Sequence, residues 1–237
     1  MNKLTTSSFL PAVRNTDIMR GKTYVGIDFG TSTTVVSIAS YDQNNNLINT
    51  NSLRLKQKLP DGTLYSSEIV PSVIAWNNNQ ILVGEGASQL KYYLKRGKNI
   101  WYSFKMELGE DLGAKYYESE LRDVEPFCIR NPKDAARVFF AYLKYLITGY
   151  CNENNLSNDI LYAVSIPASF EANQRKDLLD ALMANEMKVA KQALIDEPNA
   201  AFISYAMSRA IEGKPMLVNP EYNSKVLVFD FGGGTCD

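Results

Sequence analysis

Two apolar stretches, one near each end of the chain, run into the same short polar sequence. Residues 24–30 read Tyr-Val-Gly-Ile-Asp-Phe-Gly, and residues 226–232 read Val-Leu-Val-Phe-Asp-Phe-Gly. An apolar run that stops at glycine is typical of a buried strand that enters a tight turn. A threonine follows each copy, at Thr31 and Thr235. The repetition predicts two related half-domains in which a strand ends in the same kind of turn.

The first half of the chain is predicted to form successive antiparallel strands followed by short helices, an order typical of a mixed sheet. The expected strands span residues 24–29, 33–40, 47–55, 69–76 and 80–84, with a loop over residues 56–67. Trp101, Phe104 and Leu108 recur at helical spacing and predict a helix over residues 99–108. A short helix is also expected over residues 87–96, and one or two edge strands within residues 111–130.

Residues 132–150 form the clearest predicted helix. Asn131 is suited to cap its N-terminus, Pro132 is favoured in the first turn, and Asp134 suits the positive end of the helix dipole. The apolar stripe that packs into the core is expected to consist of Val138, Tyr142, Tyr145 and Leu146.

The chain then alternates strands and helices. The expected elements are a strand over residues 160–166, a helix that ends at Asn185, a strand over residues 187–196, a helix that begins at Glu197 and a loop over residues 208–224. Pro198 is favoured at the first position of a helix. Glu197 therefore lies where a strand ends and a helix begins, which is where ligands bind in open α/β sheets.

The composition excludes several kinds of functional site. The 237 residues include no histidine, which removes His-based triads, His metal sites and imidazole acid–base catalysis. A net charge of −1 gives no general attraction to nucleic acid or to an anionic membrane. The cysteines Cys128, Cys151 and Cys236 are odd in number and widely spaced, which favours free thiols and a cytoplasmic location over a disulfide framework or a zinc site.

The residues at the two strand ends suit a phosphate and a cation. Consecutive glycines let the backbone approach a ligand closely and present N–H groups to an anion. The preceding acids, Asp28 and Asp230, suit a hydrated cation beside that phosphate. A single copy could equally be an ordinary strand and glycine turn, but two matching copies favour a phosphate site. The Asp-Phe-Gly of protein kinases is a spurious match, because a His-Arg-Asp loop cannot exist in a chain without histidine.

Together the two hairpins resemble those with which the actin-like ATPase superfamily grips phosphates from opposite lobes. Within that superfamily, residues 24–237 are similar to the seventy-kilodalton heat-shock chaperones. Three further stretches carry this similarity: Phe-Lys-Met-Glu-Leu-Gly at 104–109, Ile-Pro-Ala-Ser-Phe at 166–170 with Gln-Arg at 174–175, and Glu-Pro-Asn-Ala-Ala at 197–201. The resemblance implies an α/β fold of the actin-like ATPase (ribonuclease H-like) type, with a mixed sheet, flanking helices and only the first lobe present.

The resemblance also implies a function. Members bind ATP or ADP between two lobes with Mg²⁺ and often K⁺, and hydrolysis drives the binding and release of unfolded polypeptide with the help of cochaperones. Carried over, the metal-binding residues would be Asp28 and Asp230. The phosphate-binding residues would be Gly30, Thr31, Ser32, Thr33, Gly232, Gly233, Gly234 and Thr235. The catalytic residues would be Lys105, Glu197 and Asp237.

Lys105 and two further residues in the similar stretches, Pro167 and Arg175, have ordinary explanations when taken alone. A helical lysine such as Lys105 is usually a solvated surface charge, Pro167 could simply stop a strand, and Arg175 could be a surface charge. With the resemblance, Lys105 would reach the γ-phosphate, Pro167 would relay the nucleotide state, and Arg175 would signal toward a substrate domain.

Several residues depart from the chaperone pattern and put inter-domain coupling in question. Ser32 and Thr33 stand in place of a Thr-Asn pair. The others are Asp196 and Asn199 around Glu-Pro, Phe231 and Cys236 in the second hairpin, and the absence of an arginine near residues 191–193.

The predicted organisation has three parts: a flexible arm over residues 1–22, the first lobe over residues 23–224, and the first strand and phosphate loop of a second lobe over residues 225–237. We therefore expect this chain to be inactive or weakly active by itself, and to form a homodimer through the last strand. A sugar kinase of the same superfamily and a nucleotide-linked assembly module remain the alternatives.

Overall fold

The computed structural model describes residues 21–41, 47–212, 227–228 and 232. The predicted arm, except for its last two residues, and most of the predicted second hairpin lie outside these ranges. Asp230, Gly233, Gly234, Thr235 and Asp237 are among the predicted site residues that lie outside them. The three-part organisation therefore stays a prediction.

The main sheet of the described chain is mixed, as predicted. Its strands are β1 (Thr23–Phe29), β2 (Thr33–Tyr41), β3 (Leu47–Ser52), β6 (Ile69–Pro71), β10 (Ile160–Ile166) and β11 (Val189–Asp196). The order is β11-β10-β1-β2-β3, and β6 pairs with β2. The strands β11, β10 and β1 are parallel, whereas β2 is antiparallel to its neighbours β1, β3 and β6. Side chains on β1 alternate between buried and more exposed, as expected for a strand with one face on the core.

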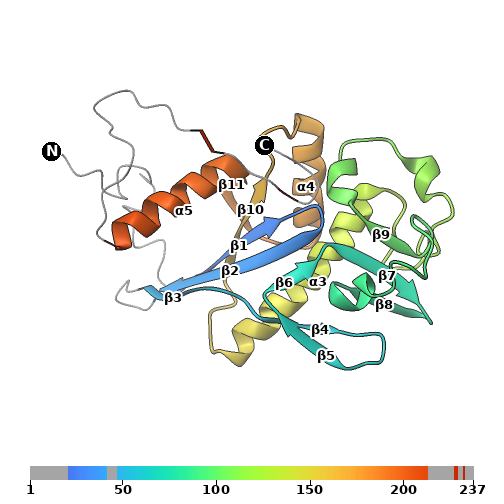
Figure 1. Ribbon diagram of the computed structural model, residues 1–237, viewed down its shortest axis with the longest axis horizontal. Coiled ribbons are helices and arrows are strands. Elements are labelled where there is room, and N and C mark those ends of the chain that lie inside the picture. The colour runs from blue at the N-terminus through green and yellow to red at the C-terminus, as the bar shows by residue number, and fades with distance from the viewer. Residues whose placement is uncertain (1–20, 42–46, 213–226, 229–231, 233–237) are drawn as a thin grey trace.

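Three long helices cover this sheet: α3 (Pro132–Glu153), α4 (Ala172–Ala184) and α5 (Glu197–Ile211). In Figure 1, α3 and α4 lie side by side, and α5 lies apart from them next to β10 and β11. The helix α3 begins as predicted, because Asn131 Oδ1 accepts a hydrogen bond of 2.8 Å from Asp134 N. It continues beyond Tyr150 to Glu153, and α5 continues to Ile211, where a loop had been expected from residue 208.

The predicted stripe of α3 is wrong in one position. Tyr145 is 74% exposed, whereas Phe139, Phe140 and Leu143 are fully buried. The other three predicted members, Val138, Tyr142 and Leu146, do pack against the core, but they lie at one side of the buried face rather than at its centre. The Phe139 and Phe140 rings pack against Phe29 of β1, with centroid separations of 5.9 and 5.0 Å. This contact fixes the end of β1 against α3.

A smaller region lies beside the main sheet, and several predictions for it are wrong. The range 47–55 is not one strand, and the range 56–67 is not a loop: β4 (Leu55–Lys58) and β5 (Leu64–Ser67) form a separate hairpin. The strand predicted over residues 69–76 is split between two sheets, because β6 (Ile69–Pro71) belongs to the main sheet. The second part, β7 (Val73–Asn77), forms the expected hairpin with β8 (Gln80–Val83). The helix α2 is short, spanning Glu85–Ser88.

The predicted helix over residues 99–108 is also wrong. Ile100–Tyr102 forms strand β9 against β7, and Phe104–Glu107 forms a 3₁₀ turn, η3. Ser103 separates them with a positive φ of 58°. Trp101, Phe104 and Leu108 have the spacing of a helix only because all three are buried, each from a different local conformation. No described strand lies within residues 111–130, which contain the 3₁₀ turn η4 (Gly113–Tyr116) and turns.

No helix among the described residues is both long enough and apolar enough to cross a membrane.

Candidate functional site

The carboxyl ends of the parallel strands β1, β10 and β11 lie at one edge of the sheet. Asp28 is aligned with Ser165 across β1 and β10, and Ile166 is aligned with Asp196 across β10 and β11. Glu197 follows Asp196 directly and begins α5. The carboxyl ends of parallel strands are where ligands bind in open α/β sheets. The sheet therefore places Asp28 and Glu197 on the same edge, although 169 positions separate their numbers.

Asp28 is an exposed carboxylate with one oxygen held in place. Ser165 Oγ donates a hydrogen bond of 2.7 Å to Asp28 Oδ1. Among the described residues, no side chain or backbone group donates to the other carboxylate oxygen, so the group is oriented and exposed to solvent. Sequence reasoning missed Ser165. Its only signal was a small polar residue at an otherwise buried end of a strand.

The turn between β1 and β2 is held by Ser72, which the sequence placed only within the strand expected over residues 69–76. Ser72 Oγ donates to the Gly30 carbonyl oxygen at 2.8 Å, and Ser72 N donates to the Ser32 carbonyl oxygen at 2.9 Å. Thr31 is buried, whereas Ser32 and Thr33 are exposed. The turn thus exposes the side chains of Ser32 and Thr33 on a backbone that the hydrogen bonds from Ser72 hold in place.

Replacing Gly30 by alanine is expected to destabilise this turn. A Cβ at Gly30 would overlap the Thr33 carbonyl oxygen, and a backbone atom cannot move aside cheaply. We expect the free energy of unfolding to fall by about 1–3 kcal/mol, measured by urea denaturation. The control is Gly26→Ala in β1, the strand that leads into this turn, where a Cβ meets nothing within 4 Å. An equal fall in the free energy of unfolding in the two variants would show that Gly30 is not required by close backbone packing in the turn.

Lys105 and Glu197 form an ion pair at the same edge. Lys105 Nζ lies 2.7 Å from Glu197 Oε1, and the two side chains are only 2% and 10% exposed. The ammonium group also lies 5.8 Å from the centroids of the Phe29 and Phe170 rings. The ordinary explanation of Lys105 as a surface charge is therefore wrong. The structure brings Lys105 and Glu197 together, next to the end of β1.

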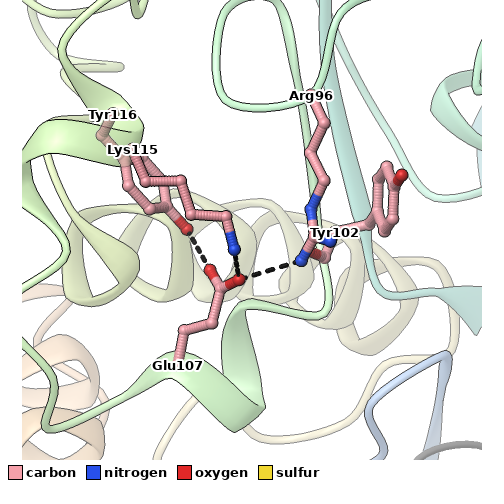
Figure 2. Close-up of polar contacts among 5 residues, drawn as sticks. All are labelled: Arg96, Tyr102, Glu107, Lys115 and Tyr116. Carbon is pink, nitrogen blue, oxygen red and sulfur yellow. Dashed lines mark hydrogen bonds and ion pairs between the residues drawn. The ribbon is translucent and has the colours of Figure 1, made fainter.

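Glu107 belongs to the same 3₁₀ turn as Lys105 and anchors it through the contacts drawn in Figure 2. This buried carboxylate accepts hydrogen bonds from Arg96 at 2.9 Å and from the Tyr116 hydroxyl at 2.8 Å, and it contacts the Lys115 ammonium. Arg96 in turn lies over the Tyr102 ring, 4.5 Å from its centroid. Burial, followed by the bond to Glu107, raises the pKa of Tyr116 well above its ordinary value. Two cations and one hydroxyl thus satisfy a buried acid and fix the position of η3.

Arg175 contacts Asp196, the residue directly before Glu197. Its Nη2 donates to Asp196 Oδ1 at 2.8 Å, and its Nε donates to the Phe170 carbonyl oxygen at 2.9 Å. Pro167 directly follows the last residue of β10 and is buried. Arg175 is therefore engaged with the end of β11 rather than standing free on the helix surface.

The position of the second predicted hairpin relative to this site is not described, because Gly232 is its only site residue within the described ranges. Within the described ranges, no group of three or more acid or cysteine side chains could hold a metal ion. The residues that the structure brings together are Asp28, the turn at 30–33, Lys105 and Glu197.

The mixed sheet, the flanking helices and the first hairpin are the fold of the first lobe of an actin-like ATPase. A family model described as Hsp70 protein matches residues 24–237. The chain therefore belongs to the Hsp70 family.

Similar proteins include a heat shock cognate HSP70 protein from Trypanosoma brucei brucei, 34% identical over 70% of this chain and 25% of that protein. The chaperone protein DnaK of Mesomycoplasma hyopneumoniae strain 232 is 28% identical over 90% of this chain and 28% of that protein. The DnaK of Metamycoplasma hominis is 26% identical over 90% of this chain and 29% of that protein. The chain thus spans between a quarter and a third of the length of these relatives.

Proposed function

We propose that this chain provides one lobe of the ATP site of a chaperone that couples ATP hydrolysis to the binding and release of unfolded polypeptide. The observation that carries the proposal is the buried Lys105–Glu197 pair at the strand ends, next to the end of the strand that carries Asp28. Family membership favours this function over a sugar kinase or an assembly module. Nucleotide, polypeptide and cochaperones would be the partners of the whole protein, and a cytoplasmic location and a homodimer stay predictions.

The first hairpin would bind the metal and the phosphate chain. The exposed carboxylate of Asp28, oriented by Ser165, fits a hydrated Mg²⁺ ion, because Mg²⁺ keeps several waters and is often bound through one or two carboxylates. Bound Mg²⁺ would neutralise charge on the phosphates. The phosphates would contact Gly30, Thr31, Ser32 and Thr33 from this side, and Gly232, Gly233, Gly234 and Thr235 from the other. Asp230 would be the second metal-binding acid, and K⁺ is carried over from the resemblance alone.

Lys105 and Glu197 would take different parts in hydrolysis. The Lys105 ammonium would offset negative charge on the transferring phosphoryl group, and the Glu197 carboxylate would orient the attacking water, together with Asp237. Such a reaction depends on positioning and charge compensation rather than on covalent chemistry. In the structure the two side chains hold each other at 2.7 Å, so each is already confined to the edge where it would act.

The test is a nuclear magnetic resonance titration of the ¹⁵N-labelled chain with millimolar Mg-ATP and, separately, with Mg-pyrophosphate. We expect Mg²⁺-dependent shifts of the amides at residues 30–33. We also expect Asp28→Asn to weaken the apparent affinity about tenfold, or 1.4 kcal/mol.

Asp61→Asn is the matched control, because Asp61 is also an exposed acid that accepts a hydroxyl hydrogen bond, 2.6 Å from Thr63 Oγ1. This control should bind as the parent chain does. A folded chain whose first hairpin does not respond to millimolar Mg-ATP would contradict the proposed function.

A further inference from the structure

The first two turns of α4 contact the segment that carries Lys105. Asn173 Nδ2 donates to the Gly109 carbonyl oxygen at 2.9 Å, and Gly109 N donates to Asp177 Oδ2 at 3.0 Å. Asn173 and Asp177 are four residues apart and therefore lie on one face of the helix. Lys133 of α3 lies 3.4 Å from Asp177 Oδ1 and holds that carboxylate from its other side. Both polar backbone groups of Gly109 are thus bonded to α4.

This contact is too close to admit a side chain at position 109. Gly109 has a positive φ of 78°, and a Cβ there would lie 2.7 Å from Asn173 Nδ2 and 2.9 Å from Gln174 Cγ. Gly109 follows Lys105 by four residues, and most of the chain between them is the 3₁₀ turn η3. Because that connection is short and hydrogen-bonded, the position of Gly109 largely determines the position of Lys105.

The same two turns of α4 contact the segment that carries Glu197. Arg175 bonds Asp196 at 2.8 Å, and Asp196 is the residue directly before Glu197. Asp196 is also one of the departures from the chaperone pattern. Its charge gives Arg175 an ionic partner at the end of β11.

We propose that Asn173, Arg175 and Asp177 are positioning residues that hold Lys105 and Glu197 at bonding distance. We call these three residues the α4 bracket. One helix thus sets the separation of a cation and an acid that come from segments 92 positions apart. The role of the bracket in ATP hydrolysis rests on the proposed function, but its effect on the separation of the pair does not.

The test is a double-mutant cycle for the pair, measured by urea unfolding without nucleotide. The cycle compares Lys105→Met, Glu197→Gln and the double variant, first in the parent chain and then in a chain with Asn173→Ala and Asp196→Asn. Asn173→Ala removes the side-chain hydrogen bond to Gly109, next to the Lys105 turn. Asp196→Asn removes the ionic partner of Arg175, next to Glu197. We expect the coupling factor between Lys105 and Glu197 to fall about tenfold in the altered chain. A purely structural role would lower stability and leave the coupling unchanged.

Asn185→Ala is the matched control background. Asn185 Nδ2 donates to the carbonyl oxygens of Arg137 and Ala181, both at 2.9 Å, at the far end of α4. We expect the coupling factor there to stay within about twofold of the parent value. The same coupling factor in both backgrounds would overturn the proposal. If the Asn173→Ala, Asp196→Asn chain does not melt cooperatively, Asp196→Asn alone serves, with an expected fall of about threefold.

Adding Mg-ATP to the parent chain separates the two proposals. A loss of coupling in the altered chain supports the α4 bracket, even if the first hairpin of the parent shows no response to Mg-ATP and the proposed function fails. An unchanged coupling factor overturns the bracket, even if that hairpin responds to nucleotide.

Discussion

Replacing Lys105 by methionine is expected to lower the free energy of unfolding by about 3–5 kcal/mol. The substitution keeps the length and the apolar part of the side chain but removes the ammonium group. Glu197, whose side chain is 10% exposed, then loses the cation that lies 2.7 Å away. Removing one member of a buried ion pair is costly, because the charge that remains has given up water and loses its counter-ion. The measurement is urea denaturation followed by far-UV circular dichroism.

Glu197→Gln tests the reason for this loss. In the Lys105→Met background, Glu197→Gln should recover a large part of the lost stability, because a neutral amide is cheaper to bury than a carboxylate that has lost its counter-ion. A double variant no more stable than Lys105→Met would show that the loss came from packing and not from charge.

An exposed pair of the same residue types provides the matched control. Lys56 Nζ lies 2.9 Å from Glu153 Oε1, but the two side chains are 57% and 60% exposed. Lys56→Met should therefore change the free energy of unfolding by less than about 1 kcal/mol. If Lys105→Met costs no more than Lys56→Met, the buried pair does not contribute as we infer.

Phe139→Ala is expected to lower the free energy of unfolding by about 3–5 kcal/mol. Phe139 is fully buried, and its ring contacts Phe29 at 5.9 Å and Phe104 at 5.8 Å between centroids. Alanine would leave a cavity between α3, the end of β1 and η3. Since Phe29 lies between Asp28 and Gly30, and Phe104 precedes Lys105, the cavity would also loosen the candidate site. We expect faster amide hydrogen exchange at residues 28–31 and 104–108.

Tyr145→Ala is the control for this prediction. It truncates an aromatic side chain on the same helix, but Tyr145 is 74% exposed. Its effect should stay within about 0.5 kcal/mol. The hydrophobic pattern placed Tyr145 in the core, so an equal loss in both variants would support the pattern and contradict the structure.

The candidate site could be predicted in part from local sequence. The β1–β2 hairpin, the cap of α3 by Asn131 and the start of α5 at Glu197 were all predicted, because each depends on residues within one or two turns of the chain. Ser165 and Ser72 could not be found in this way. Each acts on a partner far away in sequence, and a single serine in a strand has no pattern that points to that partner.

The error at residues 99–108 shows the limit of hydrophobic spacing. The spacing of Trp101, Phe104 and Leu108 correctly indicated that all three are buried, yet it predicted the wrong local structure. Strand β9 exists because β7 offers it an antiparallel partner, and the 3₁₀ turn after it is held by the Glu107 contacts and by α4. Burial is visible along the chain, whereas the partner that sets the backbone conformation is not.

By itself, the sequence determined the residue types of the candidate site and the local elements that carry them. Apolar alternation, glycine turns and helix caps are short-range properties, and they act before distant segments meet. Only the tertiary structure decided that Lys105 is buried, that its partner is Glu197, and that α4 bonds the segments on both sides of this pair. Those contacts join segments up to 92 positions apart, and they form only when the sheet brings the ends of its parallel strands to one edge.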